Sequence, residues 1–142
     1  MKKFGLLFFV FVFIITNCRA ISRDLQYKKE IDAVIKKQIP YSKKQIKSII
    51  KEIKSEENIY VKRVLIEQGI NSVMLEFYIK LAGVTNKYFD INKDMPNTDY
   101  YADIKSVINP YLENNGADVL KIDTFLKYAD KQQKLIEEKY NN

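Results

Sequence analysis

The chain has 142 residues, a net charge of +6, no histidine, no tryptophan and one cysteine. Without histidine, a Ser-His-Asp triad and a histidine-ligated metal site are excluded, and one cysteine cannot form an internal disulfide. We therefore expect no enzyme, no cofactor and no metal site. Lysine outnumbers arginine by 21 to 3. We attribute this bias to an AT-rich genome, so it is poor evidence for a nucleic-acid partner.

The first eighteen residues carry the strongest targeting signal. Two lysines precede an apolar run at 4–15, and the chain then reaches Asn17 and Cys18. This order is that of an export signal, and the run is shorter than the roughly 20 residues that span a bilayer. Cleavage before Cys18 would leave a lipid-modified cysteine at the start of the mature chain. Cleavage after Ala20 would instead release a soluble protein, and a retained membrane anchor is the third alternative.

This signal resembles those of bacterial lipoproteins, in particular the relaxed signals of Borrelia and related spirochaetes. In the strict pattern Gly, Ala or Ser precedes the cysteine; here Asn17 does, a departure that spirochaete lipoproteins often show. The chain looks like the small plasmid-type surface lipoproteins of Lyme-disease spirochaetes, with the specific resemblance confined to residues 1–18. The resemblance implies a signal peptide at 1–17, palmitate-type lipid on Cys18, and attachment to the outer membrane with the protein exposed at the surface.

Helical spacing of apolar residues dominates the rest of the chain, and no segment alternates as a strand does. After a short tether at 18–22, we expect one domain at 23–142, an all-α bundle of five or six helices. The predicted apolar faces are Leu25, Ile31, Val34 and Ile35; Ile46, Ile49, Ile50 and Ile53; Ile70, Val73, Met74, Phe77, Tyr78 and Leu81; Tyr101, Ile104, Val107 and Ile108; and Phe125, Leu126, Tyr128 and Leu135.

Local signals predict where these helices begin and end. Pro40 is expected to end the first helix (23–38), because proline disfavours helical geometry in the residue before it. Ser22 and Ser42 are expected to cap the first and second helices. The stretch 56–58 is either the end of the second helix or merely a polar stretch before 60–68. The other boundary signals are Gly69 as a C-cap, a loop at 90–97, Thr98 or Asn97 as an N-cap, Pro110 as a kink or an end, the breaker 114–116 and Asp123 as the last N-cap.

Charge is unevenly distributed along the predicted bundle. Residues 23–63 carry twelve Lys or Arg and six Asp or Glu, whereas residues 64–142 carry nine and twelve. Within the predicted second helix one stripe opposite the isoleucines holds Lys43, Lys47, Lys51 and Lys54, and the first helix has similar clusters at 28–29 and 36–37.

Three interpretations of the basic stripe are open. It can be a solvated helical face, or a surface that settles against anionic headgroups at roughly 1 kcal/mol per cation. It can also be a docking patch for an acidic partner such as a sulfated polysaccharide, whose binding would depend strongly on salt. The export signal argues against a nucleic acid.

Two further motifs have polar or aromatic character. The oxygen-bearing side chains at 90, 92 and 94 resemble the opening of an EF-hand loop, but Met95 replaces its glycine and Tyr101 its bidentate glutamate. We therefore interpret this stretch as a polar loop. Tyr100 and Tyr101 suit an interface, because tyrosine buries a large body and keeps a polar tip. A position in the core or at its rim is the other interpretation.

These observations predict a small lipid-anchored helical protein that acts by non-covalent binding. The expected partners are the membrane, through the lipid, and an acidic glycan or a host protein, as the resemblance implies. Two alternatives stay open: a structural or assembly lipoprotein that faces the periplasm, and a secreted soluble protein cleaved after Ala20. The very short tether favours either the periplasmic alternative or a position close against the membrane.

Overall fold

The computed structural model describes the backbone of residues 2–140 and the side chains of residues 20–140. Within residues 2–140 the chain forms four α-helices and no strand. They are α1 (Lys2–Ser55), α2 (Ile59–Phe89), α3 (Tyr101–Asn114) and α4 (Val119–Tyr140), with a short 3-10 turn, η1 (Asn92–Asp94), between α2 and α3. The all-α prediction is therefore confirmed, but the expected count of five or six helices is wrong.

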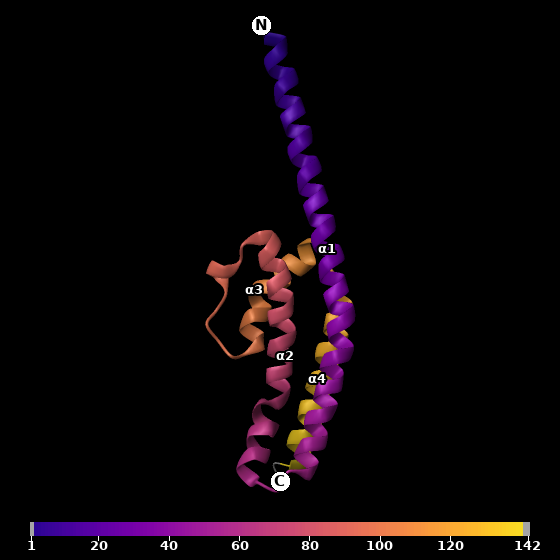
Figure 1. The fold of residues 1–142 in the computed structure, drawn as a ribbon, viewed down its shortest axis with the longest axis vertical. Helices are drawn as coiled ribbons and strands as arrows, with labels where there is room; N and C mark the ends of the chain where they lie inside the picture. Colours follow the sequence, from indigo (N-terminus) through magenta and orange to yellow (C-terminus); the bar gives the residue numbers. More distant parts are fainter. Residues whose placement is uncertain (1, 141–142) are drawn as a thin grey trace.

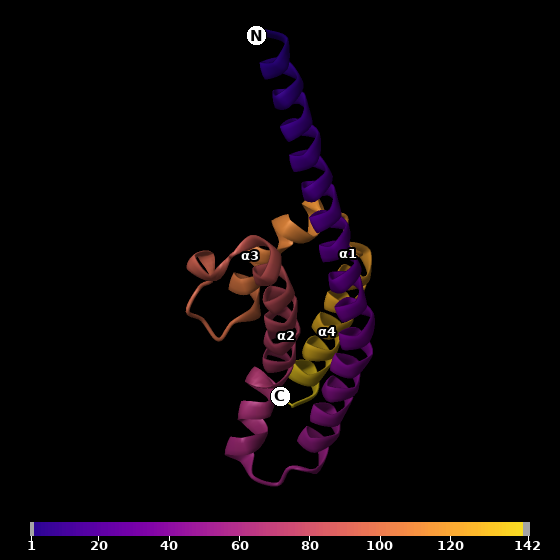
Figure 2. The same cartoon turned by 45° about the horizontal axis from the view of Figure 1, so that its top comes forward.

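The helices pack around an antiparallel hairpin of α1 and α2 (Figure 1). Helix α4 lies beside both and runs parallel to α1, whereas α3 packs only on α2 among the principal contacts. Both views show the N-terminal part of α1 projecting beyond the bundle (Figures 1 and 2). The turn between α1 and α2 and the end of α4 lie at the opposite end of the molecule.

The core is contained in the bundle itself. All buried apolar side chains among the described residues lie between Tyr27 and Ile136. The apolar face predicted within 70–81 is buried throughout. Leu25 and Leu135 were expected on apolar faces but are 63% and 48% exposed, because both lie on outward sides of their helices. Since the described core begins at Tyr27, the bundle can close without the projecting part of α1.

The prediction that Pro40 ends a helix is wrong, because α1 continues through it. An interior proline loses one backbone hydrogen bond and costs about 3 kcal/mol. Burial on both sides of the proline outweighs this cost: Ile31 and Ile35 before it and Ile46 and Ile53 after it are all fully buried. Each fully buried isoleucine is worth roughly 1.5–3 kcal/mol. If the helix ended at residue 40, the chain would change direction, and either the isoleucines before the proline or those after it would leave the core.

Two predicted caps of the first two helices also fail. Ser22 and Ser42 lie inside α1, and Ser42 is fully buried. Gly69 lies inside α2 rather than at a helix end. The polar stretch 56–58 separates two helices, which is one of its two predicted interpretations. Within it, the Asn58 side chain caps α2 by accepting hydrogen bonds from the backbone N–H groups of residues 60 and 61 at 3.0 and 3.3 Å.

In the second half of the chain the boundary signals are only partly right, because the N-cap of α3 is Tyr100 and neither Asn97 nor Thr98. Helix α3 ends at Asn114, and Gly116 has a φ of 66°, so the breaker at 114–116 is confirmed. Pro110 lies inside α3 and does not end it. Helix α4 begins before Asp123, contrary to the prediction. Asp118 takes the capping position and accepts a hydrogen bond from the Lys121 N–H at 3.3 Å.

The predicted signal and lipidation site fall in the projecting part of α1. Cys18 and the tether 18–22 lie within this helix. The side chain of Cys18 and the apolar run at 4–15 lie outside the described side chains, so lipidation stays a prediction. Over the part that is described, no helix is long and apolar enough to cross a membrane.

Candidate binding surface

The continuity of α1 joins lysines that the sequence assigned to two separate helices. One side of α1 carries Lys29, Lys36, Lys43, Lys47, Lys51 and Lys54, which we call the lysine face. Their separations of seven, seven, four, four and three residues keep them on one side of a helix with about 3.6 residues per turn. At about 1.5 Å per residue, the lysine face is roughly 38 Å long.

Five of these six lysines are exposed, and Lys43 is half-buried at the contact with α4. The Lys43 Nζ lies 5.1 Å from the centre of the Tyr128 ring, where the aromatic face attracts the ammonium. None of the six forms an ion pair with another described residue. All four lysines of the predicted stripe thus lie on one surface, and Lys29 and Lys36 extend it.

The carboxylates of this stretch of α1 do not neutralise the lysine face. Glu30 accepts hydrogen bonds from the Lys87 Nζ and the Tyr88 hydroxyl of α2, both at 2.7 Å, and these bonds lower the pKa of Glu30. Asp32 accepts from the Lys28 Nζ at 2.5 Å and from the backbone N–H of residue 118 at 3.0 Å. Glu52 follows Lys51 directly and is therefore turned about 100° around the helix.

In each of the lysine pairs 28–29 and 36–37, the two side chains lie on different sides of α1. Lys28 is engaged with Asp32 and does not belong to the lysine face. Lys37 lines a groove between α1 and α2, together with Lys80. Only one member of each pair contributes to the lysine face, because adjacent residues point in directions about 100° apart on a helix.

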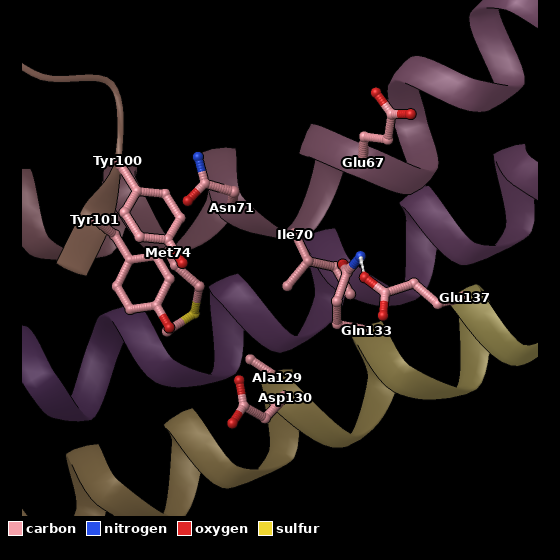
Figure 3. A pocket seen from close by; sticks show the side chains of 10 residues that line it. All are labelled: Glu67, Ile70, Asn71, Met74, Tyr100, Tyr101, Ala129, Asp130, Gln133 and Glu137. Atoms are coloured by element: carbon pink, nitrogen blue, oxygen red, sulfur yellow. Dashed lines mark hydrogen bonds between the residues drawn. The ribbon is translucent and has the colours of Figure 1, made fainter.

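A small cavity of about 190 Å³ lies where α2, the start of α3 and α4 meet (Figure 3). Tyr100 and Tyr101 form part of its wall, with ring centres 5.3 Å apart. Three carboxylates from two other helices complete a polar lining, those of Glu67, Asp130 and Glu137. Sequence reasoning missed these carboxylates, because α2 and α4 are far apart in the chain and ordinary acidic residues on a helix give no signal.

Two of the three carboxylates at this cavity are engaged in contacts within their own helices. Glu67 pairs with Arg63 at 2.7 Å, and Glu137 accepts a hydrogen bond from Gln133 at 2.7 Å. Burial raises the pKa of Tyr101, with the Asp130 carboxylate adding to the shift. The volume is below the roughly 300–1,000 Å³ of ligand pockets. We therefore regard the cavity as a packing gap and Tyr101 as a half-buried rim residue, which is one of the two predicted placements.

The oxygen-rich loop at 90–94 follows the end of α2, and its first residue is the C-cap of that helix. Asp90 follows the end of α2 with a φ of 49°, and its backbone N–H donates to the carbonyl oxygen of Asn86. Residues 92–94 form η1. Among the described residues, no cluster of three or more Cys, Asp or Glu side chains is arranged to hold a metal ion.

Comparison with known proteins identifies no relative: no protein-family model, no curated protein and no solved structure matches the chain. Its function therefore has to be argued from the chemistry of its own surfaces.

Proposed function

We propose that this chain is a lipid-anchored protein of the bacterial outer membrane that holds an acidic glycan by non-covalent contact along the lysine face. The proposal rests on the length of the lysine face and on its lack of neutralising carboxylates. Six lysines follow one another along roughly 38 Å of a single helix. None of them has a carboxylate partner among the described residues.

The shape of the lysine face favours a linear partner. A single long row of cations matches an extended chain of sulfate or carboxylate groups, which can contact several lysines at once. Each exposed charge contributes little alone, about 1 kcal/mol or less, so useful affinity requires several simultaneous contacts. A compact acidic protein would reach only part of the row.

The direction of the row supports a glycan rather than lipid headgroups. The lysine face runs along the axis of α1, and the lysines follow the projecting N-terminal part of that helix. If the chain is anchored at Cys18, a row in this direction leads away from the bilayer. Headgroup contact would then be confined to the nearest lysines.

The test is binding of heparin, as a sulfated polysaccharide, to residues 20–142. Binding should weaken steeply between low and physiological salt, because exposed charges are screened over about 8 Å at 0.15 M. Changing Lys36, Lys47, Lys51 and Lys54 to Gln should abolish binding and keep the helix content, since glutamine is nearly as good a helix former as lysine.

The matched control changes four exposed lysines outside the face to Gln, namely Lys80, Lys127, Lys131 and Lys134. Both variants lose the same net charge, and only the first should lose heparin. Equal losses would mean that net charge alone is recognised, and the proposal would be wrong. Protease treatment of intact cells tests the location: a protein exposed at the surface is degraded, whereas one that faces the periplasm is protected.

A further inference from the structure

A groove of about 390 Å³ opens between α1 and α4, beside the middle of the lysine face. Its volume falls within the roughly 300–1,000 Å³ of small-molecule sites. The walls are apolar: Ile39 and Pro40 come from α1, and Leu120 and Phe125 come from α4. Phe125 is fully buried, so the accessible apolar surface comes from Leu120, which is 75% exposed, and from Ile39 and Pro40. Because this leucine is exposed beside other apolar groups, a bound hydrocarbon chain would remove apolar surface from water, which is favourable.

The rim of the groove is positively charged. Lys36, Lys43 and Lys121 line it, and no carboxylate does among the described residues. Lys121 pairs with Asp118, which lies outside the groove, so its charge is already compensated. Lys36 forms no ion pair with another described residue, and the Lys43 ammonium is held over the Tyr128 ring. Two cations on α1 therefore remain for an anion.

We propose that this groove binds a single-chain anionic amphiphile, a fatty-acid anion, with its hydrocarbon against Leu120, Ile39 and Pro40 and its carboxylate at Lys36 and Lys43. The site goes beyond glycan binding, because a polyanion needs only the lysine row and has no use for apolar walls. A neutral hydrocarbon, in turn, would leave the rim lysines unused.

The position along α1 favours a free fatty acid over a lipid that remains in the bilayer. Pro40 lies 22 residues after Cys18, which is roughly 33 Å along the helix. This choice of source rests on the proposed anchoring at Cys18, whereas the chemistry of the groove does not.

The test is calorimetric titration of residues 20–142 with octanoate, decanoate and laurate, each below its micelle concentration. Affinity should rise at least about tenfold from octanoate to laurate, because each fully buried CH₂ is worth up to about fourfold. Dodecyltrimethylammonium, with the same chain and the opposite charge, should bind at least about tenfold more weakly than laurate. Affinity that is independent of chain length, or equal for both charges, would overturn the proposal.

Two pairs of variants assign the binding to the groove. Leu120→Ser should weaken laurate about tenfold, whereas Leu135→Ser, at another exposed leucine of α4, should change it less than about twofold. Lys36→Gln with Lys43→Gln should weaken laurate about fivefold, and Lys47→Gln with Lys54→Gln should not. Thermal melts should match those of the unchanged protein, since all these side chains except Lys43 are exposed.

Failure of this proposal can be distinguished from failure of glycan binding. Leu120→Ser should leave heparin binding unchanged, because it removes no charge. Equal weakening of laurate by Leu120→Ser and Leu135→Ser would show nonspecific adsorption, and would refute the groove without touching the lysine face. Binding of laurate only in the presence of lipid vesicles would likewise refute it.

Discussion

Gly69 of α2 lies so close to Ile49 of α1 that a Cβ at residue 69 would be 2.8 Å from the Ile49 Cγ2. The Ile49 side chain cannot easily turn away, because a β-branched residue in a helix has one strongly preferred rotamer. Glycine at position 69 therefore allows the two helices to approach. It is needed for packing between helices and not for ending one.

The first prediction concerns this contact. Gly69→Ala should lower the free energy of unfolding by about 1–2 kcal/mol through overpacking, although alanine favours helix by about 1 kcal/mol. In the background of Ile49→Ala, which removes the Cγ2, the same change should instead raise it by about 0.5–1 kcal/mol. Urea unfolding followed by circular dichroism measures both. The same sign in the two backgrounds would contradict the close approach.

The second prediction contrasts two buried tyrosines. The Tyr27 hydroxyl lies 3.0 Å from the Thr85 Oγ1, which itself donates to the Leu81 carbonyl oxygen at 2.9 Å. Tyr27→Phe should therefore lower the free energy of unfolding by about 1 kcal/mol. The Tyr78 hydroxyl is buried and has no hydrogen-bond partner among the described residues. Tyr78→Phe should leave stability at pH 7 unchanged or raise it, and a loss as large as that of Tyr27→Phe would argue for a partner.

The third prediction concerns alkaline pH. Burial raises the pKa of Tyr78 and, against the effect of its hydrogen bond with Thr85, that of Tyr27. The folded state thus prefers the neutral phenol, whereas an unfolded tyrosine ionises near pH 10. The contribution of these buried phenols to the free energy of unfolding should be fully present below about pH 9. It should be lost progressively as the pH rises above about 10. Unfolding measured between pH 8 and 11 should show a shallower fall for Tyr78→Phe; an identical fall would exclude Tyr78 as a cause.

The fourth prediction tests the two sides of α1. Ile46 is fully buried and Lys47 is exposed, although they are neighbours in sequence. Ile46→Asp should lower the free energy of unfolding by at least about 3 kcal/mol, because it places a charge in the core. Lys47→Asp should change it by less than about 0.5 kcal/mol. Similar melting temperatures for the two variants would show that the register of α1 is wrong.

The fifth prediction concerns the anchor. Cys18 is the only cysteine and so the only site for thioether lipidation. Cys18→Ala should abolish labelling by a palmitate analogue and move the protein from the detergent phase to the aqueous phase, or leave it uncleaved. The physical reason is that each buried CH₂ of a lipid chain is worth about 0.8 kcal/mol. Labelling of the variant, or none of the unchanged protein, would exclude lipidation at this residue.

The sequence by itself determined the helical class and much of the core. The predicted stripe matches every buried residue of α2 between 70 and 81, since 3.6-residue spacing depends only on helix geometry, although Ile66, Ala82 and Thr85 of the same helix are also buried. The breaker at 114–116 was equally predictable, because Gly116 can adopt the positive φ of this turn without steric cost. Each of these features depends on residues that are near one another in the chain.

Only the tertiary structure decided the features that depend on distant partners. Pro40 stays helical because burial before and after it offsets the lost hydrogen bond, and Gly69 lies within a helix because Ile49 packs against it. For the same reason the sequence predicted four lysines of the basic surface, whereas only the unbroken helix α1 shows that Lys29 and Lys36 lie on the same side. It could not supply the groove at all, since α1 and α4 meet there only after the chain has folded.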